Sequence, residues 1–263
     1  MPAVSALKPL TESTLRRLTG DALVTLLGEA ERYEASASPG LLTALCNEPI
    51  ADLNMIVVGA GASPERFRSS AQACLDRQLP FLAMVFPEAG HSIDEMASAL
   101  GLVHAVDFPI MVRESVPMEP AGHPGLSVVR GAGSGDARAT AQVLESAFSM
   151  SFDSVMRAMP PSLTGSPGID VYVARLDDVP VGTATVTWHG ETCGIWAMGT
   201  ATNRQRGGIG RRVLSSVIAR ARAEGAQRFF LGATPAGLRL YESLGFTTQF
   251  KTRVWAYGET NQD

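Results

Sequence analysis

The stretch that decides the fold is Gln205-Arg206-Gly207-Gly208-Ile209-Gly210, placed between a predicted strand and a predicted helix. The strand covers 194–200, and apolar residues recur on one helical face from Gly210 until Gly225 ends the pattern. Glycines let an anion approach the backbone closely, and the free amides and positive dipole end of a helix N-terminus attract negative charge. The stretch therefore predicts a pyrophosphate-binding turn.

The residues around this turn exclude two commoner glycine loops. No Lys-Ser or Lys-Thr pair follows the glycines, so the stretch is not a P-loop. The strand before it belongs to an antiparallel meander rather than to a βαβ unit, which argues against a dinucleotide fold. Arginines at 204, 206, 211 and 212 lie within reach of further phosphates. The alternative is a glycine-rich strand–helix turn whose arginines are simply solvated.

The elements on either side predict a mixed α/β domain around a central sheet. Asp136 is the expected N-cap of a helix that ends near Phe148, and 149–167 is expected to be irregular. The other expected elements are strands at 126–130, 171–175, 181–188, 228–232 and 247–257 and a helix at 236–244. The three strands between 171 and 200 are joined by turns, which indicates an antiparallel meander.

A second motif, Leu240-Tyr241-Glu242-Ser243-Leu244-Gly245-Phe246, follows the glycine turn. It is similar to the Leu-Tyr-x-x-x-Gly-Phe signature of GNAT N-acetyltransferases, whose acyl-CoA loop is matched by Gln205, Gly208 and Gly210. The resemblance covers about residues 126–257 and implies a GNAT fold, in the α/β class with a mixed sheet. It also implies transfer of an acetyl group from acetyl-CoA to a primary amine, by direct attack in a ternary complex.

The resemblance also assigns roles to particular residues. It implies that Tyr241 is the catalytic acid that protonates the leaving thiolate. Amides of the turn would bind the CoA pyrophosphate, and backbone groups of the preceding strand would pair with pantetheine. The residues so implied to bind acetyl-CoA are Met198, Gly199, Thr200, Gln205, Arg206, Gly207, Gly208, Ile209, Gly210 and Arg211. A plainer alternative makes Tyr241 a core residue of its helix.

The sequence departs from the family pattern at two places. Family members often carry Asn shortly before the Tyr helix, where this chain has Thr234-Pro235-Ala236-Gly237. The strand Ile195–Thr200 has no Glu or Asp, although many relatives place their general base there. Glu191, His189 and Asp153 could substitute, but each is better explained as a turn or surface residue, so the base stays unassigned. A missing base favours a second hypothesis, a non-catalytic acyl-CoA-binding sensor or interaction protein.

The chain divides at 115–125, where three prolines and two glycines predict a linker. We therefore expect a degenerate GNAT-like domain at 1–114 and the catalytic domain at 126–263. The first half would repeat part of the order of strands and helices expected in the second half. Its expected elements are strands at 53–58, 81–86 and 103–112 and helices at 64–78 and 93–100. The segment Ala99-Leu100-Gly101-Leu102 is similar to Ser243-Leu244-Gly245-Phe246, which lies 144 residues later in the chain. This correspondence indicates an internal duplication.

The same offset places Pro64, Arg66 and Ala97 where the later half has Gly208, Gly210 and Tyr241. The first half therefore lacks both the amide turn and the acid, and we expect it to shape one wall of the acceptor cleft. Its Leu53-Asn54 pair and its Phe108–Met111 run are similar to recurring features of such degenerate domains, with no role evident from the sequence.

Composition and charge limit the partners. Hydrophobic residues make up 45% and charged residues 18% of the chain, which predicts a packed core. Net charge is −7 over 1–124 and +3 over 125–263, which suits a small polyanionic ligand better than a nucleic acid. The acceptor is expected to be a small-molecule amine, with a protein lysine as the alternative, and a homodimer is conceivable. Scattered Cys and His residues predict no metal site, and we expect a cytoplasmic protein with no membrane partner.

Overall fold

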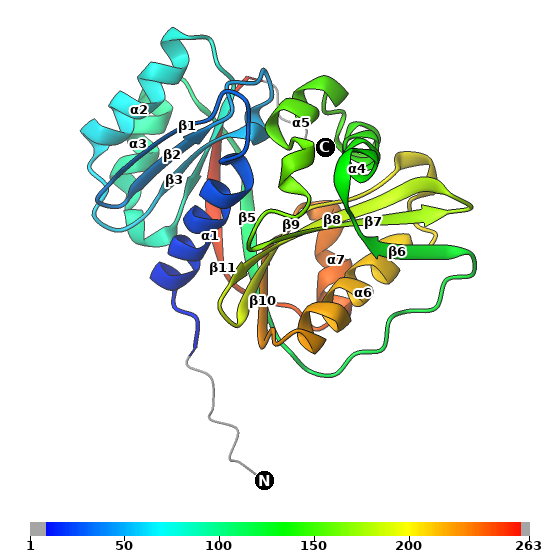
Figure 1. The fold of residues 1–263 in the computed structure, drawn as a ribbon. Coiled ribbons are helices and arrows are strands. Elements are labelled where there is room, and N and C mark those ends of the chain that lie inside the picture. Colours follow the sequence, from blue (N-terminus) through cyan, green and yellow to red (C-terminus); the bar gives the residue numbers. More distant parts are fainter. Residues whose placement is uncertain (1–8, 259–263) are drawn as a thin grey trace.

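Eleven strands form one continuous sheet in the computed structural model, which describes residues 9–258 (Figure 1). The strands of the N-terminal half are β1 (Glu34–Ser38), β2 (Leu41–Leu45), β3 (Asn54–Val58), β4 (Phe81–Val85) and β5 (Val103–Glu114). Those of the C-terminal half are β6 (Leu126–Arg130), β7 (Ile169–Leu176), β8 (Val179–His189), β9 (Thr192–Thr200), β10 (Arg228–Gly232) and β11 (Thr247–Tyr257). Their order across the sheet is β1-β2-β3-β4-β11-β5-β10-β9-β8-β7-β6.

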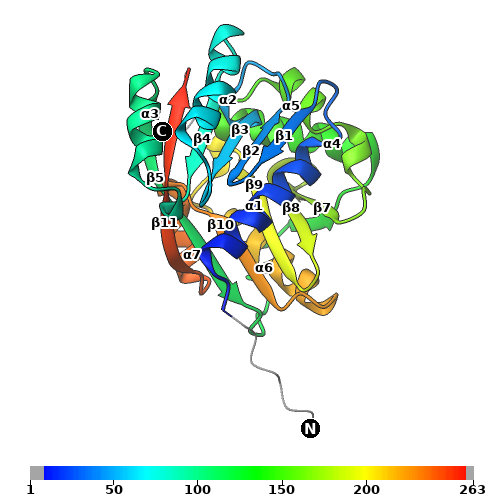
Figure 2. The same ribbon diagram turned by 90° about the vertical axis from the view of Figure 1, so that its left-hand side faces the viewer.

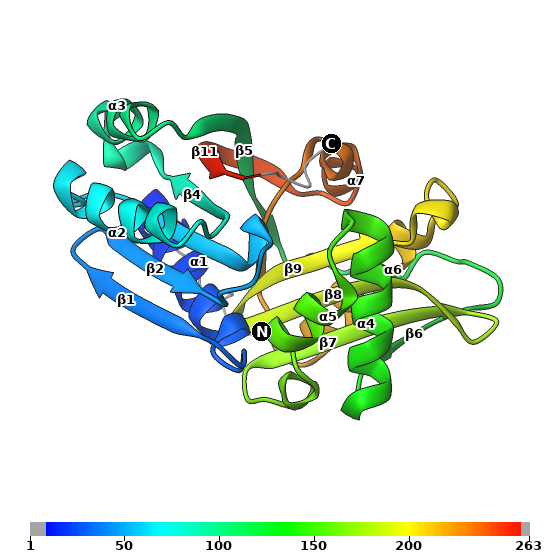
Figure 3. The same cartoon turned by 90° about the horizontal axis from the view of Figure 1, so that it is seen from above.

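Helices cover both faces of this sheet. The helices are α1 (Glu12–Leu27), α2 (Pro64–Asp76), α3 (His91–Ala99), α4 (Gly133–Phe148), α5 (Phe152–Ala158), α6 (Ile209–Ala223) and α7 (Pro235–Ser243). Short 3₁₀ helices are η1 (Ala51–Leu53), η2 (Pro87–Ala89), η3 (Pro161–Leu163) and η4 (Thr202–Arg204). In the C-terminal half, α4 and α6 pack on opposite faces of β8 and β9, and α5 packs beside α4 (Figures 1 and 3).

The last strand of each half is exchanged with the other half. β11 lies between β4 and β5, and β5 lies between β11 and β10, so each pairs antiparallel with a strand of the opposite half (Figure 2). In the pair that β5 and β11 form with each other, Phe108 lies opposite Thr252, its own counterpart at the offset of 144. A local pseudo-twofold axis therefore passes through this strand pair, and the two halves share one sheet.

The repeat predicted from the sequence is present in the fold. β1-β2-β3-α2-β4-α3-β5 corresponds to β7-β8-β9-α6-β10-α7-β11, whereas β6 has no counterpart among the described residues before β1. The turns after α3 and α7 even share their hydrogen bonds, because Leu102 N donates to Ala97 O at 3.0 Å and Phe246 N donates to Tyr241 O at 3.1 Å. The chain is thus a pair of related α/β units, of which the first is incomplete.

Three local expectations need correction. Asp136 is not the N-cap of α4, which begins three residues earlier; its carboxylate instead accepts a hydrogen bond from Ala132 N and pairs with Arg175. The stretch 149–167 contains the helix α5, which begins at a Ser151 N-cap. The sequence analysis also missed α1 and the hairpin of β1 and β2.

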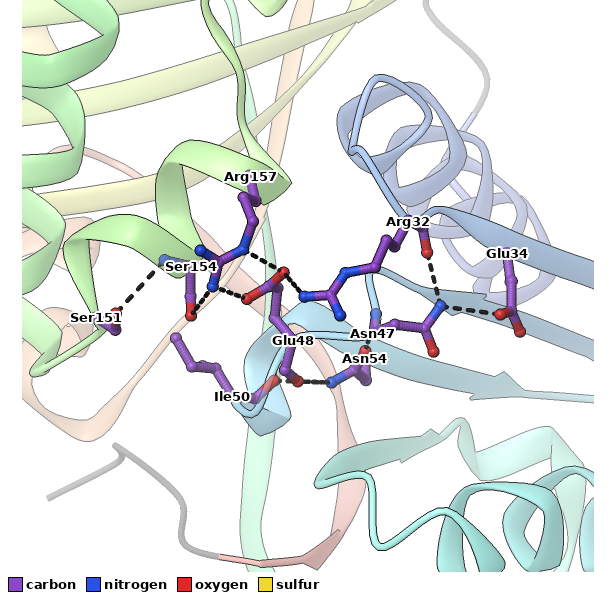
Figure 4. A network of polar contacts seen from close by, with 9 residues as sticks. All are labelled: Arg32, Glu34, Asn47, Glu48, Ile50, Asn54, Ser151, Ser154 and Arg157. Carbon is purple, nitrogen blue, oxygen red and sulfur yellow. Dashed lines mark hydrogen bonds and ion pairs between the residues drawn. The ribbon is translucent and has the colours of Figure 1, made fainter.

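A buried carboxylate joins the two halves away from the shared strands. Glu48, only 1% exposed, follows β2 and accepts hydrogen bonds from Arg157 of α5 at 2.8 and 2.6 Å and from Arg32 at 2.7 Å (Figure 4). Burial alone would raise the pKa of Glu48, but the donors Arg157, Ser154 and Arg32 outweigh it and lower the pKa to about 2. Glu48 is therefore ionised and holds α5 against the N-terminal half.

None of the helices within 9–258 combines the length and the apolar character needed to cross a membrane. Over the same residues, His, Cys, Asp and Glu side chains form no group of three or more that could hold a metal ion. The three cysteines are buried and unbridged.

Candidate functional site

A bulge in β9 opens a cleft in the middle of the C-terminal half. The register between β8 and β9 shifts between Thr183 and Thr185, opposite Ala197, whose φ is +45°. The parallel pairing of β9 with β10 ends at the pair Gly194–Phe230, after only three residue pairs. The two strands diverge beyond this point, so one edge of β9 faces the cleft.

A groove of about 600 Å³ occupies this cleft. It is lined by most of the residues predicted to contact acetyl-CoA, together with α7 and its preceding turn. The lining residues are Ala147, Phe148, Met198, Gly199, Thr200, Gln205, Arg206, Gly208, Gly210, Arg211, Thr234, Pro235, Ala236, Gly237, Leu240 and Tyr241. The predicted Gly207 and Ile209 lie outside this lining: the Gly207 carbonyl contacts the His123 ring at 3.1 Å, and Ile209 is in the core.

The glycine turn lines the groove at the N-terminus of α6. Arg206 and Gly208 both have positive φ, at +62° and +83°, and no side chain within 9–258 caps the N-terminus of α6. Successive amides in such a turn point to one side, where they form a concave anion site. At Gly210 a Cβ would lie 3.2 Å from Leu240 and 3.5 Å from the Thr200 hydroxyl, so a side chain there would press on both.

The four arginines near the turn separate into two groups. Arg206 and Arg211 line the groove, and Arg211 also donates to the Ser243 hydroxyl at 2.7 Å. Arg212 was expected to reach a phosphate, but it donates to the Ala121 carbonyl of the linker at 3.0 Å. Arg204, in η4, lies outside the groove lining. The cationic side of the groove therefore consists of two arginines rather than four.

Tyr241 lies where the groove meets a second cavity, because it lines both. It is 8% exposed, and burial raises the pKa of its phenol to about 12. Gly237, one helical turn earlier, makes room for it, since a Cβ there would lie 2.7 Å from the Tyr241 ring. The absence of a side chain at Gly237 therefore leaves room for the Tyr241 ring. The phenol stays protonated at neutral pH and can act as a proton donor.

The second cavity lies between the two halves and measures about 250 Å³. Its floor takes one or more residues from each of the neighbouring strands β3, β4, β11, β5, β10 and β9. Its other walls come from the helices α1, α4, α5 and α7 and from η1. The exchanged strands supply Phe108 and Val254 at the centre of this floor. Phe148, Met198, Thr234 and Tyr241 line both cavities, so the second cavity adjoins the groove at the predicted acid.

The base candidates from the sequence lie elsewhere. Glu191 is in the turn after β8, where its carboxylate pairs with Gln227, and Asp153 is exposed on α5. His189 bonds the Thr187 hydroxyl at 3.0 Å, and burial lowers the pKa of its imidazole. None of the three is among the described residues that line either cavity.

The acid that does line the second cavity is Asp52, in η1, which the sequence analysis did not identify. Burial raises its pKa, partly offset by a hydrogen bond from its own backbone N–H. Its only sequence signal is an acidic residue in an otherwise apolar stretch next to the Leu53-Asn54 pair.

Comparison with known proteins matches part of the sequence to one family and the fold to several solved structures. Residues 140–246 match the acetyltransferase (GNAT) family. Among solved structures, a GCN5-related N-acetyltransferase from Kribbella flavida is similar with a TM-score of 0.68 and 18% identity, over 93% of this chain and 95% of that one. A GCN5-related N-acetyltransferase from Sphaerobacter thermophilus has a TM-score of 0.61 and 16% identity, over 85% and 78%.

A tandem GNAT protein from the clavulanic acid biosynthesis pathway is similar over 96% of this chain and 98% of its own, with a TM-score of 0.57 and 12% identity. These structural likenesses extend across both halves and show the fold. Among curated proteins, none matches the sequence.

Proposed function

We propose that this protein transfers an acetyl group from acetyl-CoA to a primary amine, because residues 140–246 match the acetyltransferase (GNAT) family. The observation that supports the proposal is the groove itself, which is lined by the uncapped N-terminus of α6, by Arg206 and Arg211, and by the buried phenol of Tyr241. A ligand with a pyrophosphate at one end and a thioester at the other fits this arrangement.

The chain's own groups would hold acetyl-CoA in three places. Amides of the turn from Arg206 to Arg211 would bind the pyrophosphate, with the guanidinium groups of Arg206 and Arg211 beside it. The exposed edge of β9 at Met198 and Thr200 would pair with the pantetheine arm as an added strand. The acetyl group would then lie near Tyr241, at the junction with the second cavity.

The proposed reaction needs no covalent intermediate on the protein. The neutral amine attacks the thioester carbonyl and forms a C–N bond, and the Met198 N–H stabilises the developing oxyanion. Collapse of the tetrahedral species breaks the C–S bond, and the Tyr241 phenol donates its proton to the departing thiolate. The proton lost by the amine passes to solvent and restores the phenol.

Release of CoA thiol on mixing the protein with acetyl-CoA and an amine panel tests this function. We expect amine-dependent thiol release, with an acetylated amine identified by mass spectrometry. A protein that binds acetyl-CoA yet acetylates no amine would instead be a sensor, the alternative favoured by the absence of a carboxylate from β9.

A further inference from the structure

The cavity between the two halves contains one charged group in an apolar wall. Asp52 is the only charged residue among its lining residues, and these include leucines of α1, methionines of β3 and β4, and Phe108 of β5. Asp52 Oδ2 is buried and has no hydrogen-bond partner within the described part of the chain. The other carboxylate oxygen has only the backbone N–H of Asp52 itself, so no charged group in the described part of the chain pairs with this acid. A buried carboxylate oxygen without a partner is costly for a fold, which points to a partner that comes from outside.

The surrounding structure holds Asp52 at this position. Asn54, fully buried, donates to the Glu48, Ile50 and Pro80 carbonyls at 2.7, 3.0 and 2.9 Å. It also accepts from the Asn47 N–H at 3.0 Å, so one side chain fixes both ends of the loop that carries η1. This explains the Leu53-Asn54 pair of the sequence: Leu53 lines the cavity, and Asn54 positions the acid before it.

Asp52 and the predicted reaction centre lie at different ends of the cavity. Asp52 precedes β3, whereas Thr234 and Tyr241 follow β10, and the strands β4, β11 and β5 lie between β3 and β10. The wall between these ends is apolar. A molecule that fills the cavity would therefore have a reacting end near Tyr241, an apolar middle and a second end near Asp52.

We propose that this cavity is the acceptor site and that its substrate is a linear diamine-type molecule, in which Asp52 binds the cationic amino group that does not react. The inference rests on the proposed transferase function and adds the acceptor class and a specificity-determining residue. An ammonium group supplies the charge partner that Asp52 lacks, and an alkyl chain suits the apolar wall. The N-terminal half would thus select the acceptor while the C-terminal half binds acetyl-CoA.

The test compares linear acceptors of equal chain length that differ only at the far end. Wild-type protein should acetylate a diamine with a higher kcat/KM than the matching alkylamine, and the ω-amino carboxylate should be the poorest. Asp52→Asn should lower kcat/KM for the diamine by about 30-fold or more, as expected for loss of a buried charge pair, and leave the alkylamine nearly unchanged. Asp76→Asn, an exposed aspartate on α2, is the matched control and should change neither.

Binding of the same molecules to the wild-type protein–CoA complex, measured by calorimetry, tests the proposal without turnover and without the need for a variant. Equal binding and equal kcat/KM for the diamine and the alkylamine would overturn the proposal. So would an Asp52→Asn variant that slows all acceptors equally, which would indicate proton transfer rather than recognition. Diamine binding without any acetyl transfer would contradict the proposed function and leave the cation site standing.

Discussion

The N-termini of α6 and α2 occupy equivalent places in the two halves but differ in whether a side chain caps their backbone amides. α6 follows Gly208, which lines the groove, and has no side-chain cap among the described residues. In α2 the Ser63 hydroxyl accepts from Arg66 N at 3.2 Å, and Pro64 removes one amide altogether. Of these two equivalent helix N-termini, α2 is capped and α6 is not, which is the difference expected if only the second half binds an anion.

The helices α7 and α3 differ in a complementary way. α7 carries Gly237 and Tyr241, whereas the corresponding positions of α3 are Ile93 and Ala97, both fully buried. A small and a large residue have changed places, so each half stays packed but only one presents a phenol to a cavity. After duplication, one half can keep the cofactor chemistry while the other becomes a wall of the acceptor site.

The sharpest way to break this comparison is to remove the anion site of the second half. Gly208→Glu with Gly210→Glu puts two carboxylates at the uncapped end of α6, one of them at a φ of +83°. Acetyl-CoA affinity should fall by more than about 100-fold, equivalent to at least two charge-assisted hydrogen bonds. Calorimetry measures it, and Arg66→Glu on α2 should leave the affinity unchanged. A folded double variant with wild-type affinity would contradict the assignment of the glycine turn as the pyrophosphate site.

Removing the phenol tests the second difference. Tyr241→Phe should lower kcat by about 100-fold with acetyl-CoA affinity unchanged, because a general acid acts only in the transition state. Since the pKa of Tyr241 is raised to about 12, loss of its proton should reduce the wild-type rate only as the pH approaches that value. Stopped-flow thiol release measures both, with Tyr33→Phe as a control outside the cavities. Full activity in Tyr241→Phe would reassign the tyrosine to the core.

Glu48→Gln tests how firmly the two halves are joined. It should lower the free energy of unfolding by about 2 kcal/mol at neutral pH, since it leaves Arg157 without its buried partner, although both arginines stay partly exposed. The pKa of Glu48 is lowered from 4.5 to about 2, so its contribution should be complete above pH 4.5 and disappear as the pH falls to 2.

Urea denaturation at several pH values checks this dependence. Asp21→Asn, which breaks an exposed pair with Arg17, should cost under about 0.5 kcal/mol. If Glu48→Gln and wild type respond identically to acid, the carboxylate does not stabilise the junction.

Gly237→Ala should have the smallest effect on the chemistry. The new Cβ would press on the Tyr241 ring and displace the phenol, so kcat should fall about tenfold. Helix stability should not fall, because Ala is the better helix former. The counterpart Ile93→Val should cost about 1 kcal/mol of stability and leave kcat unchanged, measured by denaturation and by steady-state kinetics. Unaltered kcat in Gly237→Ala would show that the glycine is not needed to position the phenol.

Much of the C-terminal half could be predicted because its signals are local. The glycine turn, the Tyr helix and the meander each follow from a short pattern that needs no distant partner. α1 carried such a signal too, since Thr11 caps a helix with Leu15, Leu18 and Ala22 on one buried face, and it was overlooked.

The strand exchange and Asp52 had no comparable signal. The apolar patterns of β5 and β11 fit beside either β4 or β10. The residues of these two strands therefore do not reveal that each pairs with a strand of the opposite half. Asp52 becomes a candidate binding residue only when six strands and four α-helices, distant in the sequence, form the cavity that it lines. The domain limits, the acceptor, the cytoplasmic location and the oligomeric state stay predictions.

The most direct test of the division between the halves is the stoichiometry of acetyl-CoA binding to the intact protein by calorimetry. We predict one molecule per chain, because the N-terminus of α2 is capped and that of α6 is not. Two equivalent sites, or a single site that survives changes in the glycine turn and disappears with changes at α2, would contradict it.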